Sequence, residues 1–112
     1  MDDFDKMALV VDWLDACRNR KLDVLLDLYD PSASLECRCD RIVISGRAAL
    51  SAYWQSKLTA AAPEAFVLEE ISPFGERILL DCSDFETRRV RIAFTFDARG
   101  KIAHTDCRPA PT

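Results

Sequence analysis

The chain has 112 residues, of which 49% are hydrophobic and 30% charged, and its formal net charge is −4. This length and composition suit one compact domain spanning residues 1–112. The negative charge argues against a nucleic-acid binder, because phosphate contacts need Lys and Arg clustered on one face. No apolar run approaches the ~18 residues of a membrane span, and the acidic start lacks a basic leader, so we expect no membrane association and a cytoplasmic protein.

Two helices are predicted in the first third of the chain. Apolar side chains recur at helical spacing from Phe4 to Cys17, and Asp2 or Asp3 is placed to cap the first amides. A second, shorter set of apolar residues runs from Leu22 to Tyr29 at the same spacing, and Asp30-Pro31 should end it. We therefore expect an amphipathic helix followed by a short one.

The pattern then changes to a period of two. Leu35, Cys37 and Cys39 alternate with polar residues, which predicts a half-buried strand, and residues 42–44 predict its hairpin partner. Helical spacing returns between Leu50 and Leu58 and stops before Pro63. Four further strands are predicted over residues 66–71, 78–82, 90–96 and 102–107, with turns at residues 73–75, 83–84 and 97–100.

This order predicts an α+β domain with helices on one face of an antiparallel sheet. The second face of the strand at residues 90–96 also carries mild side chains, such as Ala93 and Thr95. Such a face suits contact with another subunit, so we expect a homodimer through the outer sheet face.

Five cysteines stand at positions 17, 37, 39, 82 and 107. Their odd number and the lack of a secretory signal predict reduced thiols. Cys37 and Cys39 form the only close pair, and the single histidine, His104, supplies no second pair for a zinc site. We therefore predict buried thiols, no metal and no cofactor.

Several short segments, taken in order, resemble a known superfamily. They are residues 22–29, Ser45-Gly46-Arg47 followed by Tyr53-Trp54, and residues 94–102. Together they resemble the nuclear transport factor two-like superfamily, in its bacterial SnoaL-like polyketide-cyclase and ketosteroid-isomerase branch. The resemblance implies a cystatin-like cone, in which a curved antiparallel sheet wraps the N-terminal helix in the order ααββαββββ. It also implies a mainly apolar pocket at the mouth of the cone and sheet faces that pair two subunits.

The same resemblance places the catalytic groups of ketosteroid isomerase on altered residues. The general-base aspartate falls on Cys37, the oxyanion tyrosine on Trp13 and the protonated aspartic acid on Ile92. Isoleucine cannot transfer a proton, and an indole offers one N–H donor. We therefore do not expect steroid isomerisation by that mechanism, and we assign no catalytic residue.

A pocket with aromatic walls is still implied. The acid that related enzymes carry on the last strand aligns with Cys107, so Thr105 should also face inward, while His104 and Asp106 should face outward unless a β-bulge shifts the register. The expected pocket residues are Trp13, Tyr29, Cys37, Trp54, Leu58, Ile92, Phe94, Thr105 and Cys107.

Three functions stay open at this point. The first is binding of a small apolar or aromatic molecule in the cone. The second is an enzyme of the isomerase, cyclase or hydratase type with a non-standard site, for which Cys37, Tyr29 and Asp106 are candidates. The third is a dimerisation or partner-binding module whose cone is filled by bulky side chains such as Trp13, Trp54 and Phe94.

Overall fold

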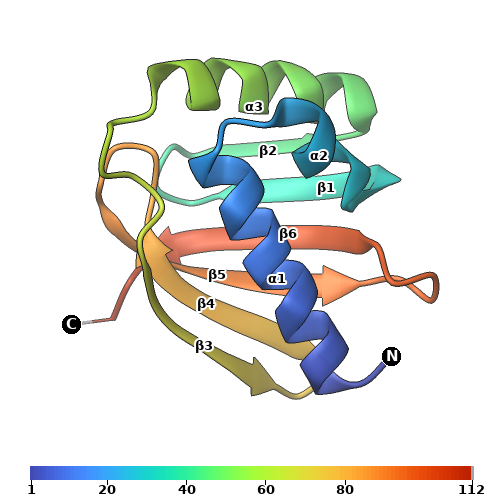
Figure 1. The fold of residues 1–112 in the computed structure, drawn as a ribbon. Coiled ribbons are helices and arrows are strands. Elements are labelled where there is room, and N and C mark those ends of the chain that lie inside the picture. The colour runs from blue at the N-terminus through green and yellow to red at the C-terminus, as the bar shows by residue number, and fades with distance from the viewer. Residues whose placement is uncertain (112) are drawn as a thin grey trace.

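The computed structural model describes residues 1–111. Within this range the elements confirm the predicted order ααββαββββ. They are α1 (Asp3–Arg18), α2 (Leu22–Asp27), β1 (Tyr29–Cys37), β2 (Ile42–Ser45), α3 (Arg47–Ala60), β3 (Leu68–Phe74), β4 (Arg77–Ser83), β5 (Arg89–Phe96) and β6 (Ile102–Pro109). The strands form one curved sheet in the spatial order β2-β1-β6-β5-β4-β3 (Figure 1).

The sheet is mixed, which corrects the expectation of a purely antiparallel one. β1 and β6 run parallel, with Cys37 opposite Cys107, whereas the other neighbouring strands are antiparallel. A parallel pair needs a long connection, and here the whole of β2 to β5 lies between the two strands. Local patterns in the sequence cannot reveal such a pairing.

The second helix is shorter than predicted. It ends at Asp27, and Tyr29 already begins β1, where it pairs with Ile102 of β6. The backbone amide of Ile102 donates to the carbonyl of Leu28 at 2.9 Å, so pairing with β6 overrides the helical spacing of the side chains. The turn predicted at residues 73–75 is also displaced, because β3 continues to Phe74 and the chain reverses at Gly75, whose φ is +62°.

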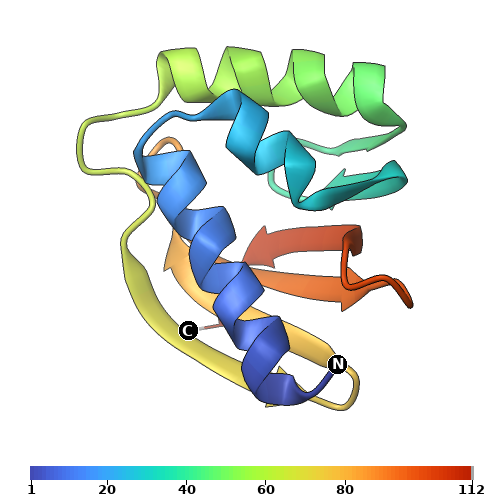
Figure 2. The ribbon, with the colours of Figure 1, turned by 45° about the vertical axis from the view of Figure 1, so that its right-hand side comes forward.

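Helix α1 crosses the concave face of the sheet, as Figures 1 and 2 show. Its start is capped by Asp2, whose carboxylate accepts from the amide of Asp5 at 2.8 Å. Val10, Leu14 and Cys17 are buried beneath it, and the helix packs on β3, β4 and α2. The predicted first helix is confirmed.

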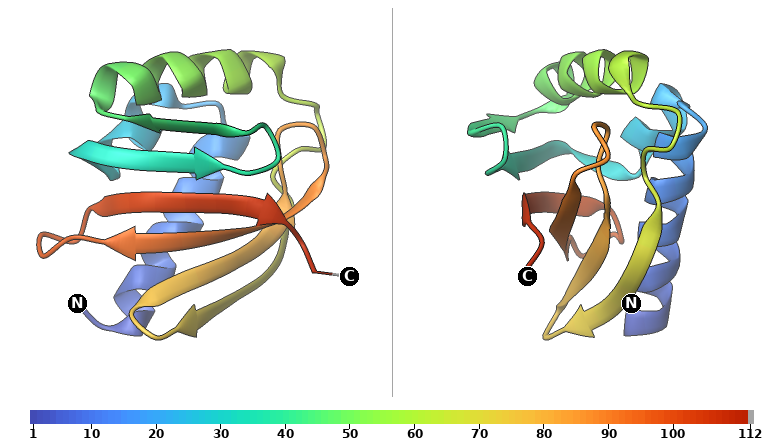
Figure 3. Two further views of the ribbon diagram at one scale, coloured as in Figure 1. Left: turned by 180° about the vertical axis from the view of Figure 1, so that it is seen from behind. Right: turned by 90° about the vertical axis from the view of Figure 1, so that its left-hand side faces the viewer.

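Helix α3 covers a different part of the sheet. It packs against α2, β1 and β2, at the end of the sheet away from β3 (Figure 3). Leu50, Trp54 and Leu58 are its buried residues, at the spacing that predicted this helix. The interior is therefore enclosed by α1 on one side and by α3 on another.

None of the helices in residues 1–111 is long and apolar enough to span a membrane.

Candidate functional site

A small cavity lies inside the cone between α1, α3 and the sheet. Its volume is about 30 Å³. One enclosed water molecule needs about 10–15 Å³, so the cavity has room for very few water-sized groups. Its walls are Trp13, Leu35, Cys37, Tyr53, Trp54, Phe66, Cys82, Asp84, Phe85, Ile92, Thr105 and Cys107.

Most of the predicted pocket residues line this cavity. Those that do are Trp13, Cys37, Trp54, Ile92, Thr105 and Cys107. Tyr29, Leu58 and Phe94 are buried in the surrounding core without lining it. The other wall residues were not predicted: Leu35, Tyr53, Phe66, Cys82, Asp84 and Phe85. Of these, Asp84 and Phe85 belong to the segment between β4 and β5, which the sequence showed only as a turn.

Aromatic rings pack edge to face and fill much of the cone. The Trp13 ring centroid lies 5.6 Å from that of Trp54 and 5.1 Å from that of Phe94, both at an interplanar angle of 81°. Trp13 Nε1 donates to the Tyr29 hydroxyl at 3.0 Å. Burial raises the pKa of Tyr29, which therefore stays a neutral phenol.

One polar atom of this aromatic wall has no partner. Trp54 is 5% exposed, and its Nε1 makes no hydrogen bond within the described part of the chain. A buried donor without an acceptor costs about 1–3 kcal/mol. A ligand or water that supplied an acceptor would recover part of that cost.

Three thiols meet where the central strands end. Cys37 closes β1, Cys107 lies opposite it in β6, and Cys39 follows in the next turn. Their three Sγ atoms lie within 4.8 Å of one another. Cys37 is buried, while Cys39 and Cys107 are half-buried, so the prediction of uniformly buried thiols is wrong for these two.

The thiols differ in their protonation. A hydrogen bond with Cys107 lowers the pKa of Cys37 to about 6, against the effect of burial and of the Asp40 carboxylate. The same hydrogen bond, together with burial, raises the pKa of Cys107. Cys37 is therefore the more acidic of the two thiols.

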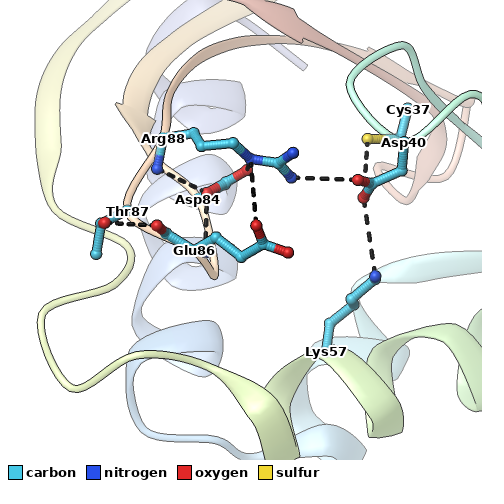
Figure 4. Close-up of polar contacts among 7 residues, drawn as sticks. All are labelled: Cys37, Asp40, Lys57, Asp84, Glu86, Thr87 and Arg88. Carbon is cyan, nitrogen blue, oxygen red and sulfur yellow. Dashed lines mark hydrogen bonds and ion pairs between the residues drawn. The ribbon is translucent and has the colours of Figure 1, made fainter.

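Charged side chains lie on one side of Cys37 (Figure 4). Asp40 Oδ2 lies 3.6 Å from Cys37 Sγ and 3.8 Å from Lys57 Nζ. Asp40 Oδ1 accepts from a terminal nitrogen of Arg88 at 3.3 Å. We call the whole set the mouth cluster: Cys37, Cys39, Asp40, Lys57, Asp84, Arg88 and Cys107.

Asp84 ties the mouth cluster to the turn between β4 and β5. It is 6% exposed, and its Oδ1 accepts from the amides of Glu86 and Arg88 at 2.9 Å each. Its Oδ2 accepts from Arg88 Nε at 2.8 Å. The sequence showed this residue only as part of a turn. The signal that could have revealed its ion pair is the presence of Arg88 four residues after it.

Arg89 and Arg91, which with Arg88 form one short basic segment, are paired on the strands. Arg89 makes a two-pronged contact with Glu69, and Arg91 makes one with Asp81. The segment is therefore largely neutralised by carboxylates and offers no phosphate site.

His104 and Asp106 lie on the outer face, on the side that the parity of β6 predicts. His104 Nδ1 lies 2.6 Å from Ser34 Oγ, and Asp106 is held by Arg38 and Arg108. Burial raises the pKa of Asp106, but the two guanidinium groups outweigh it and hold the pKa below its usual value. Asp106 is thus on the opposite sheet face from Cys37, and Tyr29 is engaged with Trp13, so the catalytic candidates Cys37, Tyr29 and Asp106 do not form one group.

No protein-family model matches the sequence, and no curated protein matches it either. Solved structures do match over nearly the whole chain. A SnoaL-like protein of unknown function from Burkholderia thailandensis superimposes with a TM-score of 0.88 at 14% identity, covering 99% of both chains. A candidate polyketide cyclase from Sinorhizobium meliloti gives a TM-score of 0.75 at 20% identity, covering 90% of this chain and 94% of that one.

A third similar structure is the epoxide hydrolase/cyclase-like enzyme SalBIII, which acts in pyran ring formation in the polyether salinomycin. Its TM-score is 0.70 at 20% identity, with 95% of this chain and 91% of that chain covered. At such identities the likeness concerns the fold. The expected cystatin-like cone of the SnoaL-like and NTF2-like proteins is confirmed.

Proposed function

We propose that this chain, which has the fold of the SnoaL-like proteins, binds a small, flat, largely apolar molecule at the mouth of the cone. The observation that carries the proposal is the cavity, in which Trp13 and Trp54 face Cys37 and Cys107. Apolar walls with a few convergent polar groups are typical of small-molecule sites. The polar groups among the cavity walls are the Thr105 hydroxyl, the Asp84 carboxylate and the thiols of Cys37, Cys82 and Cys107.

The cavity volume limits the ligand. Pockets for drug-sized ligands measure about 300–1,000 Å³, whereas this cavity measures about 30 Å³. Anything larger than a few heavy atoms must displace a wall. Tyr53, which lines the cavity and is half-buried on α3, is the wall side chain best placed to move outward.

Tryptophan fluorescence offers a direct test. Trp13 and Trp54 are the only two tryptophans of the chain, and both line the cavity. Addition of small aromatic acids, phenols and quinones should change the emission saturably and raise the melting temperature for at least one compound, because a ligand of the native state stabilises it by mass action.

A pair of variants locates the binding. Ile92→Phe adds a ring at a cavity wall and should weaken binding at least about tenfold, because overfilling a packed site costs about 1–3 kcal/mol. Val43→Phe adds the same ring at a position that is 71% exposed and should leave binding unchanged. Equal loss in both variants, or no saturable response to any compound, would count against the proposal and favour the filled-cone alternative.

A catalytic role of the isomerase, cyclase or hydratase type is the second candidate. The observation in its favour is the lowered pKa of Cys37, which places a thiolate at the cavity wall near neutral pH. Cys37→Ser should abolish turnover of a compound that the parent converts while leaving its affinity nearly intact. If the parent converts no compound, and Cys37→Ser only lowers the affinity for the ligand, catalysis is contradicted and the chain is a binding protein.

We also propose that the chain is a cytoplasmic homodimer joined through the outer sheet face. A shallow hollow on that face is lined by Phe74, Arg77, Leu79, Arg91, Ala93, Arg108 and Pro111. The charge of Arg91 on this face is offset by Asp81, so it opposes contact with a second copy less than a free guanidinium would. Sedimentation at micromolar concentration should give the dimer mass for the parent, and Ala93→Glu should give the monomer; a monomeric parent would overturn the dimer.

A further inference from the structure

We propose that Cys37, Cys39 and Cys107 bind one thiophilic divalent metal ion, of which Zn²⁺ is the type, with the Asp40 carboxylate as fourth ligand. Three cysteines and one carboxylate are a ligand set that Zn²⁺ accepts in tetrahedral geometry. The prediction of no metal site counted only the close pair Cys37 and Cys39. The third thiol comes from a strand distant in sequence.

The backbone already brings the sulfur atoms together. The parallel pairing of β1 and β6 sets Cys37 opposite Cys107, and the amide of Arg38 donates to the Cys107 carbonyl at 2.8 Å, which fixes the start of the turn that carries Cys39. All three Sγ atoms lie within 4.8 Å of one another. With Zn–S bonds of about 2.3 Å, the sulfur atoms of a tetrahedral site lie about 3.8 Å apart, so they need to approach by about 1 Å at most.

The carboxylate is at the required separation from Cys37, but it lies beyond 4.8 Å from at least one of the other two sulfur atoms and would approach them when the ion binds. Asp40 Oδ2 lies 3.6 Å from Cys37 Sγ. A tetrahedral ion bonded to sulfur at about 2.3 Å and to oxygen at about 2.1 Å sets these two atoms about 3.6 Å apart. Asp40 therefore stands where a fourth ligand belongs with respect to Cys37.

The surroundings can hold that carboxylate and offset much of the charge. Arg88 contacts Asp40 Oδ1 at 3.3 Å, which leaves Oδ2 to face the thiols, and Lys57 Nζ lies 3.8 Å from Oδ2. Three thiolates, one carboxylate and a divalent ion carry a net charge of −2, which the two cations Arg88 and Lys57 offset, while Asp84 adds one further negative charge. Outer groups that orient a ligating carboxylate are a regular part of metal sites.

Access is open from the rim. Cys39 and Cys107 are half-buried, as are Asp40 and Lys57, so an ion can reach the sulfur atoms without opening the core. The inference does not rest on the proposed ligand in the cavity. The two proposals share Cys37 and Cys107, which also line the cavity, but the metal ion needs the three thiols and the organic ligand needs the aromatic wall. Each is measured on its own, so either can fail without the other.

The test is titration of the reduced, metal-free chain with Cd²⁺ and Zn²⁺ in a phosphine reductant. Cd²⁺ should give a saturable thiolate-to-cadmium charge-transfer band in the ultraviolet at one ion per chain, with an intensity matching three thiolates. Zn²⁺ bound beforehand should compete, so that more Cd²⁺ is needed to develop the band. Tryptophan emission with organic compounds, measured on the metal-free chain, tests the cavity separately.

Variants distinguish the ligands from other cysteines. Cys39→Ser removes one ligand at a half-buried turn position that should tolerate the change. It should weaken Cd²⁺ binding at least about a hundredfold, because loss of a residue that only supports a ligand already weakens binding up to about that much. Asp40→Asn should keep the thiolate band and weaken binding about tenfold. Cys17→Ala and Cys82→Ala remove the two cysteines outside the group and should bind as the parent does.

Three results would overturn the site. They are the absence of a thiolate band in the reduced parent, full affinity in Cys39→Ser, and loss of the band in Cys17→Ala or Cys82→Ala to the same degree as in Cys39→Ser.

Discussion

The two halves of the cone interior are built from different chemistry. Beside the N-terminal half of α1, the interior is sealed: Val10, Ile78, Phe94 and Ile102 are all 0% exposed. At the carboxyl ends of β1 and β6, the interior meets the mouth cluster, where thiols, carboxylates and cations lie within contact distance. We call the first region the packed half. It holds the fold together, while binding chemistry is concentrated at the mouth.

The largest expected effect lies in the packed half. Phe94→Ala should lower the free energy of unfolding by about 3–5 kcal/mol, because it leaves a cavity against Trp13. Urea unfolding measures this, with Phe4→Ala as control, since Phe4 is 76% exposed and its loss should cost under about 0.5 kcal/mol. Similar costs at both positions would contradict a sealed half.

Substitutions at the mouth should lower the free energy of unfolding by less than substitutions in the packed half, but by a measurable amount. Asp84→Asn should lower the free energy of unfolding by about 1–3 kcal/mol, because the amide loses the charge-assisted bond from Arg88 Nε. Glu86→Gln, on the exposed part of the same turn, should change it by under about 0.5 kcal/mol. If Asp84→Asn were as harmless as its control, Asp84 would not anchor the mouth cluster.

The boundary between the two halves can be tested at Tyr29. Tyr29→Phe should cost about 1–2 kcal/mol, because it removes the hydroxyl that accepts from Trp13 Nε1 and leaves that donor buried. Tyr53→Phe, at the other tyrosine of the chain, should cost less because Tyr53 is half-buried at the mouth. The reverse order would place the stabilising hydrogen bond at the mouth instead.

The smallest effect is expected on the outer face, away from both halves. The hydrogen bonds from Arg91 hold the pKa of Asp81 below its usual value. Its contribution is therefore complete above a pH of about 3.9 and is lost as the pH falls through the lowered folded-state pKa. In Asp81→Asn the free energy of unfolding should fall less on acidification than in the parent, by under about 1 kcal/mol. Near pH 7 it should depend on pH as little as it does in the parent. A change of slope above pH 5 would contradict this assignment.

Sequence reasoning reached the packed half more easily than the mouth. The spacing of Val10 and Leu14 in α1 and of Trp54 and Leu58 in α3 predicted both helices, because burial on one side dictates a helical period. It failed at Tyr29, where the same spacing continued into a strand. The competing interaction there is pairing with β6, which no local pattern records.

The mouth cluster was accessible only in part. Cys37 and Cys107 were placed through the resemblance to related cones, but Cys39 was assigned to a strand and lies in a turn. Asp40 lies in the turn after β1, Lys57 on α3 and Arg88 in the turn after β4. These segments are distant in the sequence and meet only in the folded chain, where β1 pairs with β6. Their separate sequence contexts were those of ordinary surface residues.

Confinement of the binding chemistry to the mouth is tested most directly by following backbone amide resonances of the reduced chain during addition of one equivalent of Cd²⁺. Resonances of residues 37–40, 84–88 and 105–108 should shift saturably, while those of residues 78–80 in β4 and of the first half of α1 should stay in place. Shifts centred on the packed half, or none at the three thiols, would contradict it.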